Sequence, residues 1–232
     1  MGDTKPEVKK AIFLPFDVFE RHKTVAKAIS PRETVLDVGG GVDALNKFID
    51  NKVMVSNLQS GDILADGRNL PFNNNSFDVV TSVDVLEHVP QKDRKRFIEE
   101  LLRVAKKRVI LSVPLGTKGH IETEKKLLKI FETKKMKSGF LKEHLERGLP
   151  TFDELKSYLS SSPYKVFYSG DYRLNSFLVR FNLKSFKNSK LDKFLYFLKR
   201  SLNVILNLFY FPFSGSKKPK KFTNRIYLFI EK

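Results

Sequence analysis

Short apolar runs alternate with helical patterns through the first half of the chain. The runs are rich in valine, isoleucine and leucine, and they fall at 34–38, 52–56, 62–65, 77–82 and 108–113. Runs that are nearly continuous in apolar residues suit strands buried on both faces of a sheet. Strands that alternate with helices are typical of βαβ units around a parallel sheet. The pattern therefore predicts an α/β fold for the first half.

Helical periodicity appears before, between and after these runs. In the segment 92–106, for example, Phe97 and Leu101 fall on one face at helical spacing. Thr151 and Glu154 have the spacing of a capping box at the start of a later helix. The predicted helices cover 16–29, 44–49, 92–106, 122–137 and 152–161.

Two later runs, 165–170 and 225–230, also have the composition of strands. We expect them to form an antiparallel pair at the edge of the sheet. The basic, apolar segment that separates them is then an insertion before the last strand.

A cluster of glycines follows the first predicted strand, in the motif ValLeuAspValGlyGlyGlyValAsp (35–43). Glycines at this place let the backbone approach a ligand closely, and the helix that follows offers free N–H groups. The motif predicts a ligand site at the carboxyl end of the first strand. Taken alone, it suits a dinucleotide, a phosphate or a tight turn equally well. Taken alone, Asp37 could simply cap the following turn, and Asp66 could be an ordinary acid of a loop.

The segment from Val35 to Val89 resembles the core of class I methyltransferases that depend on S-adenosylmethionine (SAM), in particular the type 11 group. The resemblance covers about a third of the chain closely. It rests on the glycine motif, on AspGlyArgAsnLeuProPhe (66–72), and on SerPheAspValVal (76–80) with AspValLeuGluHisVal (84–89), in the order that the family shows. The resemblance implies SAM as the cofactor.

The fold that we expect is one α/β domain over residues 1–232. It is a Rossmann-like sheet of seven strands, parallel except for one antiparallel edge strand, with helices on both faces and a helical insertion before the last strand. Its parts are an N-terminal helical segment (1–31), the SAM-binding core (32–120), the second half of the fold (121–172), the basic amphipathic insertion (173–223) and the last strand (224–232).

The resemblance also implies which residues bind SAM. The acid and glycines of the first motif serve the methionine end, Asn57 faces the ribose hydroxyls, and Asp66 accepts a hydrogen bond from the adenine amino group. Leu70 packs near the adenine, and the end of the fourth strand lines the methyl-donor end. The full set is Asp37, Gly39, Gly40, Gly41, Asn57, Asp66, Gly67, Leu70, Ser82 and Asp84.

Two positions depart from the family pattern. Asp43 stands where the third glycine of the loop is usual, and Asn57 stands where an acid usually holds the ribose. Asn can accept one such hydrogen bond, but it lacks the strength of a charged acceptor. A non-catalytic protein that binds SAM or serves as a scaffold therefore remains an alternative.

Methyl transfer from a sulfonium depends mainly on proximity and alignment. A hydroxyl acceptor additionally needs a general base, for which His120, Glu143 and His144 are the candidates. We interpret Glu87 and His88 as packing or polar-network residues. The chain has four histidines and no cysteine, so we expect no metal site.

The acceptor is indicated only weakly. The segment 142–150 resembles one found in methyltransferases that act among glycan and cell-surface biosynthetic enzymes, although a surface helix ended by Gly148 and Pro150 explains it equally well. We expect a small-molecule, glycan or lipid-linked acceptor.

Positive charge is concentrated in the second half of the chain. The net charge is +17, of which residues 1–120 contribute +3 and residues 121–232 contribute +14. Between Arg173 and Arg225 there are 13 basic residues and one acid, Asp192. Such a field attracts phosphates, nucleic acid or anionic lipid.

The segment 194–213 has the pattern of an amphipathic helix. Its apolar face carries Phe194, Phe197, Leu198, Leu202, Ile205, Leu208 and Phe209, whereas Lys199, Arg200, Asn203 and Asn207 lie largely opposite. Lysines across 184–221 surround it, a combination typical of helices that lie on anionic membranes. A lid or dimer helix is the other interpretation. RNA is the competing partner, because its phosphate backbone would also be attracted by this positive charge. An RNA-directed methyltransferase is therefore an alternative function.

No stretch reaches the roughly 20 apolar residues needed to cross a bilayer, and the amino terminus lacks the pattern of a signal peptide. We expect a cytoplasmic protein that meets the membrane only at its surface.

Overall fold

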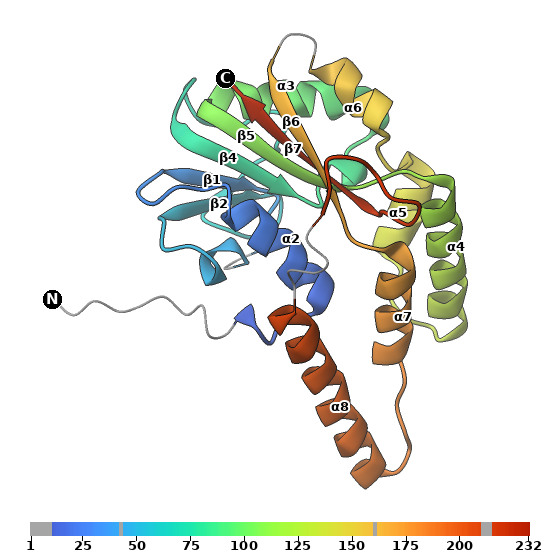
Figure 1. The fold of residues 1–232 in the computed structure, drawn as a ribbon. Coiled ribbons are helices and arrows are strands. Elements are labelled where there is room, and N and C mark those ends of the chain that lie inside the picture. The colour runs from blue at the N-terminus through green and yellow to red at the C-terminus, as the bar shows by residue number, and fades with distance from the viewer. Residues whose placement is uncertain (1–10, 42–43, 160–161, 210–214) are drawn as a thin grey trace, which may run out of the picture.

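A central sheet of seven strands organises the chain (Figure 1). The computed structural model describes residues 11–41, 44–159, 162–209 and 215–232. The strands are β1 (Val35–Val38), β2 (Val53–Asn57), β3 (Ile63–Leu64), β4 (Phe77–Val83), β5 (Ala105–Pro114), β6 (Tyr164–Ser169) and β7 (Arg225–Glu231). All seven predicted strands are therefore present.

Helices account for most of the remaining regular structure. They are α2 (Phe16–Ala26), α3 (Arg94–Val104), α4 (Lys118–Thr133), α5 (Gly139–Arg147), α6 (Phe152–Tyr158), α7 (Tyr172–Asn182) and α8 (Ser189–Leu208). Short 3₁₀ turns lie at Leu45–Lys47, Leu86–His88 and Gln91–Asp93.

The strand order is β3-β2-β1-β4-β5-β7-β6, and only β7 is antiparallel to its neighbours. The antiparallel strand was expected at the edge, and this is wrong: β7 lies between β5 and β6, and β6 forms the edge. Burial explains the arrangement. Ile226 and Leu228 are buried on β7, whereas β6 is only partly buried along most of its length. A strand that is apolar on both faces is stable only inside a sheet.

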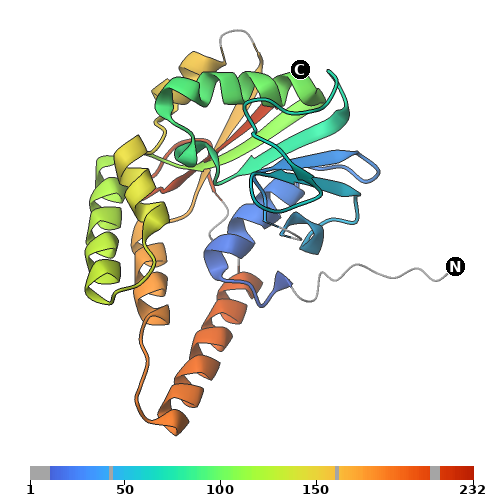
Figure 2. The ribbon, with the colours of Figure 1, turned by 180° about the vertical axis from the view of Figure 1, so that it is seen from behind.

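Two hydrophobic clusters cover the two faces of the sheet. On one face, Phe97 and Leu101 of α3 pack with Leu36 and Val80 of the sheet, and α6 joins them. On the other, Val25 of α2 packs against the sheet. Helices therefore lie on both faces, as predicted, while α4, α5 and α7 gather beyond one end of the strands (Figures 1 and 2).

Several helix boundaries differ from the prediction. The helix predicted over 44–49 is only the 3₁₀ turn Leu45–Lys47. The helix predicted over 122–137 begins at Lys118, because the Thr117 side chain caps it by accepting a hydrogen bond from the His120 N–H. The helix predicted over 92–106 ends at Val104, since β5 begins at the next residue.

The other helices are close to their predicted places. The helix predicted over 16–29 ends at Ala26, and that predicted over 152–161 ends at Tyr158. The amphipathic helix predicted over 194–213 begins earlier, at Ser189, where the Asn188 side chain caps it; residues 210–213 lie outside the described residues. Lysines that the charge pattern placed across 184–221 flank it on both sides.

Arg94 is buried at the start of α3 and connects three segments. Its guanidinium donates to Glu154 Oε1 (2.9 Å), to the Gly148 carbonyl (2.5 Å) and to the Val89 carbonyl (3.2 Å). Half of the predicted capping box is confirmed, because Thr151 accepts from the Glu154 N–H, but the Glu154 carboxylate binds Arg94 instead of completing the box. Arg94 thus fixes the end of α5 relative to α3.

Replacing Arg94 with Met should destabilise the fold by about 3–5 kcal/mol, because Glu154 and several carbonyls would lose their buried partner. Chemical denaturation measures the change. The matched control is Lys95→Met, which removes an exposed pair with Glu99 and should cost less than about 1 kcal/mol. Equal effects of the two substitutions would show that the Arg94 network contributes no special stability.

Candidate functional site

Two cavities meet at the carboxyl end of β4. The smaller, of about 170 Å³, lies against the glycine motif and is named here the glycine-loop cavity. The larger, of about 340 Å³, is lined by three histidines and is named the histidine cavity. Asp84 and His88 line both cavities. A ligand site at the carboxyl ends of parallel strands is the expected place in an open α/β sheet.

The glycine motif is held in a conformation that requires glycine. Gly39 has a φ of +79°, and a Cβ on it would lie 2.4 Å from a methyl group of Val85. A Cβ on Gly40 would lie 2.0 Å from Asp37 Oδ2. Gly41 is exposed and meets no such obstacle, and Asp43 lies outside the described residues. The loop therefore passes directly over the Asp37 carboxyl group.

Asp37 is buried beneath this loop and does not line either cavity. Its Oδ1 accepts a hydrogen bond from the Thr81 hydroxyl at 2.8 Å. Burial raises the pKa of Asp37 to about 6, against the opposing effect of that hydrogen bond. In the structure Asp37 supports the loop from below.

Asn57 lines the glycine-loop cavity and binds the loop itself. Its Nδ2 donates to the carbonyls of Gly39 (3.1 Å) and Gly40 (3.0 Å), and its Oδ1 accepts from the Gln59 N–H (3.2 Å). An ionised acid at this position would have no proton to donate to the two carbonyls. An amide in place of the usual acid therefore has a physical reason, namely its two hydrogen bonds to the loop, which the sequence alone did not indicate.

Asp66 and Gly67 form another wall of the same cavity. The Asp66 carboxylate accepts hydrogen bonds from the guanidinium of Arg68 at 2.6–3.0 Å, and these bonds hold the pKa of Asp66 below its usual range. A Cβ on Gly67 would lie 2.3 Å from the ring of Phe97, which also lines the cavity.

Five predicted cofactor residues line the cavity and five do not. The lining residues are Gly39, Asn57, Asp66, Gly67 and Asp84. Asp37 lies beneath the loop, Gly40 packs directly against its carboxyl group, and Gly41 is exposed. Leu70 is part of the hydrophobic core, and Ser82 is fully buried within β4.

Asp84 is the centre of an ion cluster at the boundary of the two cavities. Both of its carboxylate oxygens accept hydrogen bonds from the buried Arg225 guanidinium, and Arg21 approaches Oδ2 at 2.8 Å. Burial opposes the charge of Asp84, but Arg225 and Arg21 outweigh it and hold the pKa of Asp84 well below its usual range. No motif predicts this role for either arginine, since both lie far from Asp84 in the chain; an arginine at the start of the apolar strand β7 is the one signal in the sequence.

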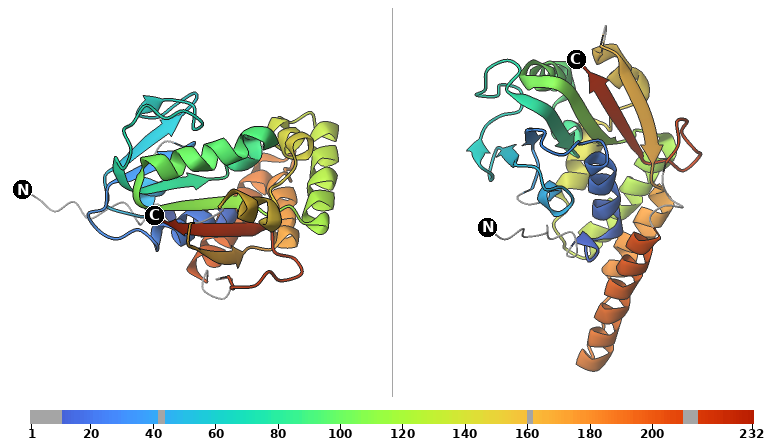
Figure 3. Two further views of the ribbon diagram at one scale, coloured as in Figure 1. Left: turned by 90° about the horizontal axis from the view of Figure 1, so that it is seen from above. Right: turned by 60° about the vertical axis from the view of Figure 1, so that its left-hand side comes forward.

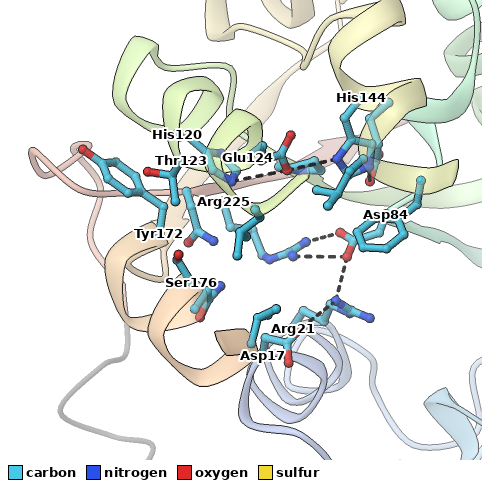
Figure 4. A pocket seen from close by; sticks show the side chains of 18 of the residues that line it. Asp17, Arg21, Asp84, His120, Thr123, Glu124, His144, Tyr172, Ser176 and Arg225 are labelled. Atoms are coloured by element: carbon cyan, nitrogen blue, oxygen red, sulfur yellow. Dashed lines mark hydrogen bonds and ion pairs between the residues drawn. The ribbon is translucent and has the colours of Figure 1, made fainter. Parts of the chain in front are cut away.

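The histidine cavity lies between α2, α4, α5, α7 and the ends of β4 and β7 (Figure 4). Its apolar wall includes Leu127, Phe131, Phe140, Leu141 and Val179. Its polar groups come from all of these elements and surround the cavity (Figure 4). An apolar cavity with a few convergent polar groups is the usual form of a small-molecule site.

Two of the predicted base candidates, His120 and His144, line this cavity, and both lie close to Glu124. His144 Nδ1 is 3.0 Å from Glu124 Oε1, and His120 Nε2 is 3.7 Å from the same oxygen. The third candidate, Glu143, does not line the cavity. It binds His88 Nδ1 at 2.7 Å. His120 and His144 therefore share Glu124, whereas Glu143 pairs with the neighbouring His88.

Glu87 and His88, interpreted from the sequence as packing or polar-network residues, also line the histidine cavity. His88 lies beside His144, with ring centres 4.9 Å apart. Burial lowers the pKa of both His88 and His120, so these imidazoles are neutral at pH 7. They can therefore accept protons or bind cations.

Comparison with known proteins identifies the core of the chain. Residues 34–113 match the family model of a methyltransferase domain. The curated proteins include no significant match to the sequence.

Solved structures with the same fold include phosphoethanolamine N-methyltransferase 2 from Haemonchus contortus, in one complex with SAM and in another with phosphomonomethylethanolamine and S-adenosylhomocysteine. The TM-scores are 0.52 and 0.53, the sequence identity is 16%, and the alignments cover 91% of this chain. They cover 52% of the Haemonchus chain, so this chain spans about half of its length. Magnesium protoporphyrin IX methyltransferase from Synechocystis aligns over 100% of this chain and 90% of its own, with a TM-score of 0.49 and 15% identity.

Residues 34–113 of this chain therefore match a methyltransferase domain, and the chain has the fold of solved methyltransferase structures, with the strand order β3-β2-β1-β4-β5-β7-β6.

Proposed function

We propose that this chain transfers a methyl group from SAM, bound in the glycine-loop cavity, to a small-molecule or lipid-linked acceptor in the histidine cavity. The observation that carries the proposal is that Asp84 and His88 line both cavities. A donor and an acceptor that meet at these two residues are close enough for direct transfer, and proximity supplies most of the catalysis in this reaction.

The cofactor end of the proposal rests on four lining residues. We expect Asp66 and the ring of Phe97 to contact the adenine, and Asn57 and Gly39 to border the ribose and methionine. Asp37 acts beneath the loop, where its carboxyl group orients the backbone that SAM would contact. The acceptor end rests on the apolar wall and on the polar network of His120, His144 and Glu124.

The helix α8 supports a location at the membrane surface. Its asparagines face the protein: Asn207 donates to the carbonyls of Ile12 (2.8 Å) and Leu14 (2.9 Å), and Asn203 accepts from the Phe16 N–H (3.0 Å). The opposite, apolar side faces outward, with Phe194 66% and Phe197 67% exposed.

This arrangement contradicts a lid whose apolar side is buried against the core of its own chain. The helix projects from the body, anchored near α2 (Figures 1 and 3). No described helix is long and apolar enough to cross a bilayer. Exposed aromatic residues on a helix with many basic neighbours suit binding in the plane of an anionic membrane.

Replacing Asp66 with Ala should weaken SAM binding by about tenfold, because one hydrogen bond to a charged acceptor would be lost. Isothermal titration calorimetry measures the affinity, and circular dichroism checks the fold. Because Asp66 also binds Arg68, the control is Arg68→Met, which should keep most of the affinity. If Asp66→Ala has no effect on affinity, the adenine lies elsewhere.

Replacing Asn57 with Asp distinguishes two roles of this side chain: holding the glycine loop, as in the structure, or binding the ribose, as in the family pattern. If the side chain holds the loop, the carboxylate will face the carbonyls of Gly39 and Gly40, and SAM affinity should fall by several-fold. If the side chain faces the ribose instead, the acid should tighten binding. Calorimetry with SAM and S-adenosylhomocysteine decides between the two results.

The double substitution Phe194→Glu and Phe197→Glu should weaken binding to phosphatidylserine vesicles by at least about tenfold, since each buried Phe contributes about 1.5–3 kcal/mol. Vesicle co-sedimentation measures it. Leu64→Glu is the control, because Leu64 is 69% exposed but lies on β3. Vesicle binding that survives the double substitution contradicts the proposed surface, and salt-sensitive binding to RNA without vesicle binding would favour the RNA-directed alternative.

A further inference from the structure

Three side chains in the histidine cavity converge in the manner of metal ligands. Glu87, His88 and His144 each offer one ligand atom, and these atoms lie within 4.8 Å of one another. Glu87 and His88 come from the 3₁₀ turn Leu86–His88, and His144 comes from α5. The fold therefore brings together ligands that are more than fifty positions apart in the sequence.

Two of these side chains are buried, and each has one polar atom without a hydrogen-bond partner. Glu87 is 1% exposed, and neither its Oε2 nor the Nε2 of His144 has a partner among the described residues. A buried polar group without a partner is costly. A cation between Glu87 and His144 would satisfy both atoms.

Both histidines are oriented by a carboxylate at the Nδ1 side of the ring. Glu143 Oε2 lies 2.7 Å from His88 Nδ1. Glu124 Oε1 lies 3.0 Å from His144 Nδ1 (Figure 4). In each ring this leaves Nε2 as the nitrogen available to a metal. Metal-binding histidines usually have such a carboxylate or carbonyl on the other nitrogen, which fixes the tautomer and the ring orientation.

We propose that Glu87, His88 and His144 bind one divalent transition-metal ion in the histidine cavity. Two imidazoles and one carboxylate are a ligand set that suits zinc, iron, cobalt or nickel better than magnesium or calcium. Three protein ligands leave coordination positions open toward the cavity. Asp84 is not a fourth ligand, because its oxygens are bound by Arg225 and Arg21.

The metal gives the proposed acceptor a defined place, and this step rests on the proposed function. A hydroxyl oxygen of the acceptor that binds the metal loses its proton more easily than in water. Glu124, whose Oε1 lies 3.0 Å from the ligand His144 and whose buried Oε2 has no hydrogen-bond partner among the described residues, would take up that proton. The oxygen then forms a bond to the methyl carbon as the carbon–sulfur bond of SAM breaks, and S-adenosylhomocysteine leaves as a neutral thioether. His88 connects the metal to the glycine-loop cavity, because it lines both cavities.

The inference departs from the expectation that four histidines and no cysteine make a metal site improbable. That expectation rested only on the number of histidines. In the structure, His88 and His144 converge on the buried Glu87, and a carboxylate lies beside Nδ1 of each ring.

The test is metal binding by the full chain, purified without a polyhistidine tag and stripped with a chelator. Titration with Zn²⁺ should show one ion per chain, and Co²⁺ should give the visible absorption of a site with nitrogen and oxygen ligands. Glu87→Gln and His144→Asn should each weaken Zn²⁺ binding by at least about tenfold. The control is His120→Asn, which changes a histidine of the same cavity outside the ligand set and should keep the affinity.

The outcomes separate this inference from the proposed function. Zn²⁺ binding that is absent, or that Glu87→Gln and His144→Asn leave unchanged while circular dichroism shows folded protein, overturns the metal site. SAM binding, measured by calorimetry on the same stripped protein, is a separate readout. If SAM does not bind but Zn²⁺ does, the methyltransferase proposal fails while the metal site stands.

Discussion

The ion cluster of Asp84, Arg225 and Arg21 is the interaction on which the rest of the site depends. It joins the end of β4, the start of β7 and helix α2, and it lies at the boundary of the two cavities. Removing one partner from a buried ion pair leaves an uncompensated charge, which is far more costly than never having had the pair. The elements that carry the cluster are therefore held at fixed positions around the place where donor and acceptor would meet.

The sequence predicted the layers of the fold better than the details of the site. All seven strands were found because their buried, nearly continuous apolar runs are a local signal. The position of β7 was not, because it depends on which strand is more deeply buried in the finished sheet. Gly39 and Gly40 were identified from their motif, and the structure explains both through contacts with Val85 and Asp37.

Residues that act through distant partners were the hardest to predict. From the sequence, Asn57 was interpreted as a weaker ligand of the ribose. Its hydrogen bonds to the glycine loop become visible only in three dimensions. Arg225 belongs to no motif, and the motif that contains Glu87 did not indicate its place among the histidines, because both roles come from burial and from neighbours brought together by the fold. In α8 the periodicity gave the apolar face correctly, yet it was the contacts of Asn203 and Asn207 that showed which side meets the protein.

The place of β7 also bears on the order in which the molecule assembles. β6 precedes β7 in the chain, but its only strand partner in the sheet is β7. The five parallel strands, β3-β2-β1-β4-β5, can pair with one another without β7. In contrast, β6 can join the sheet only after β7, which follows α8 in the chain, has paired with β5. Contacts between residues so far apart in sequence form slowly. β7 also carries Arg225, so the pairing of β7 with β5 is also the step that gives Asp84 its main counter-charge.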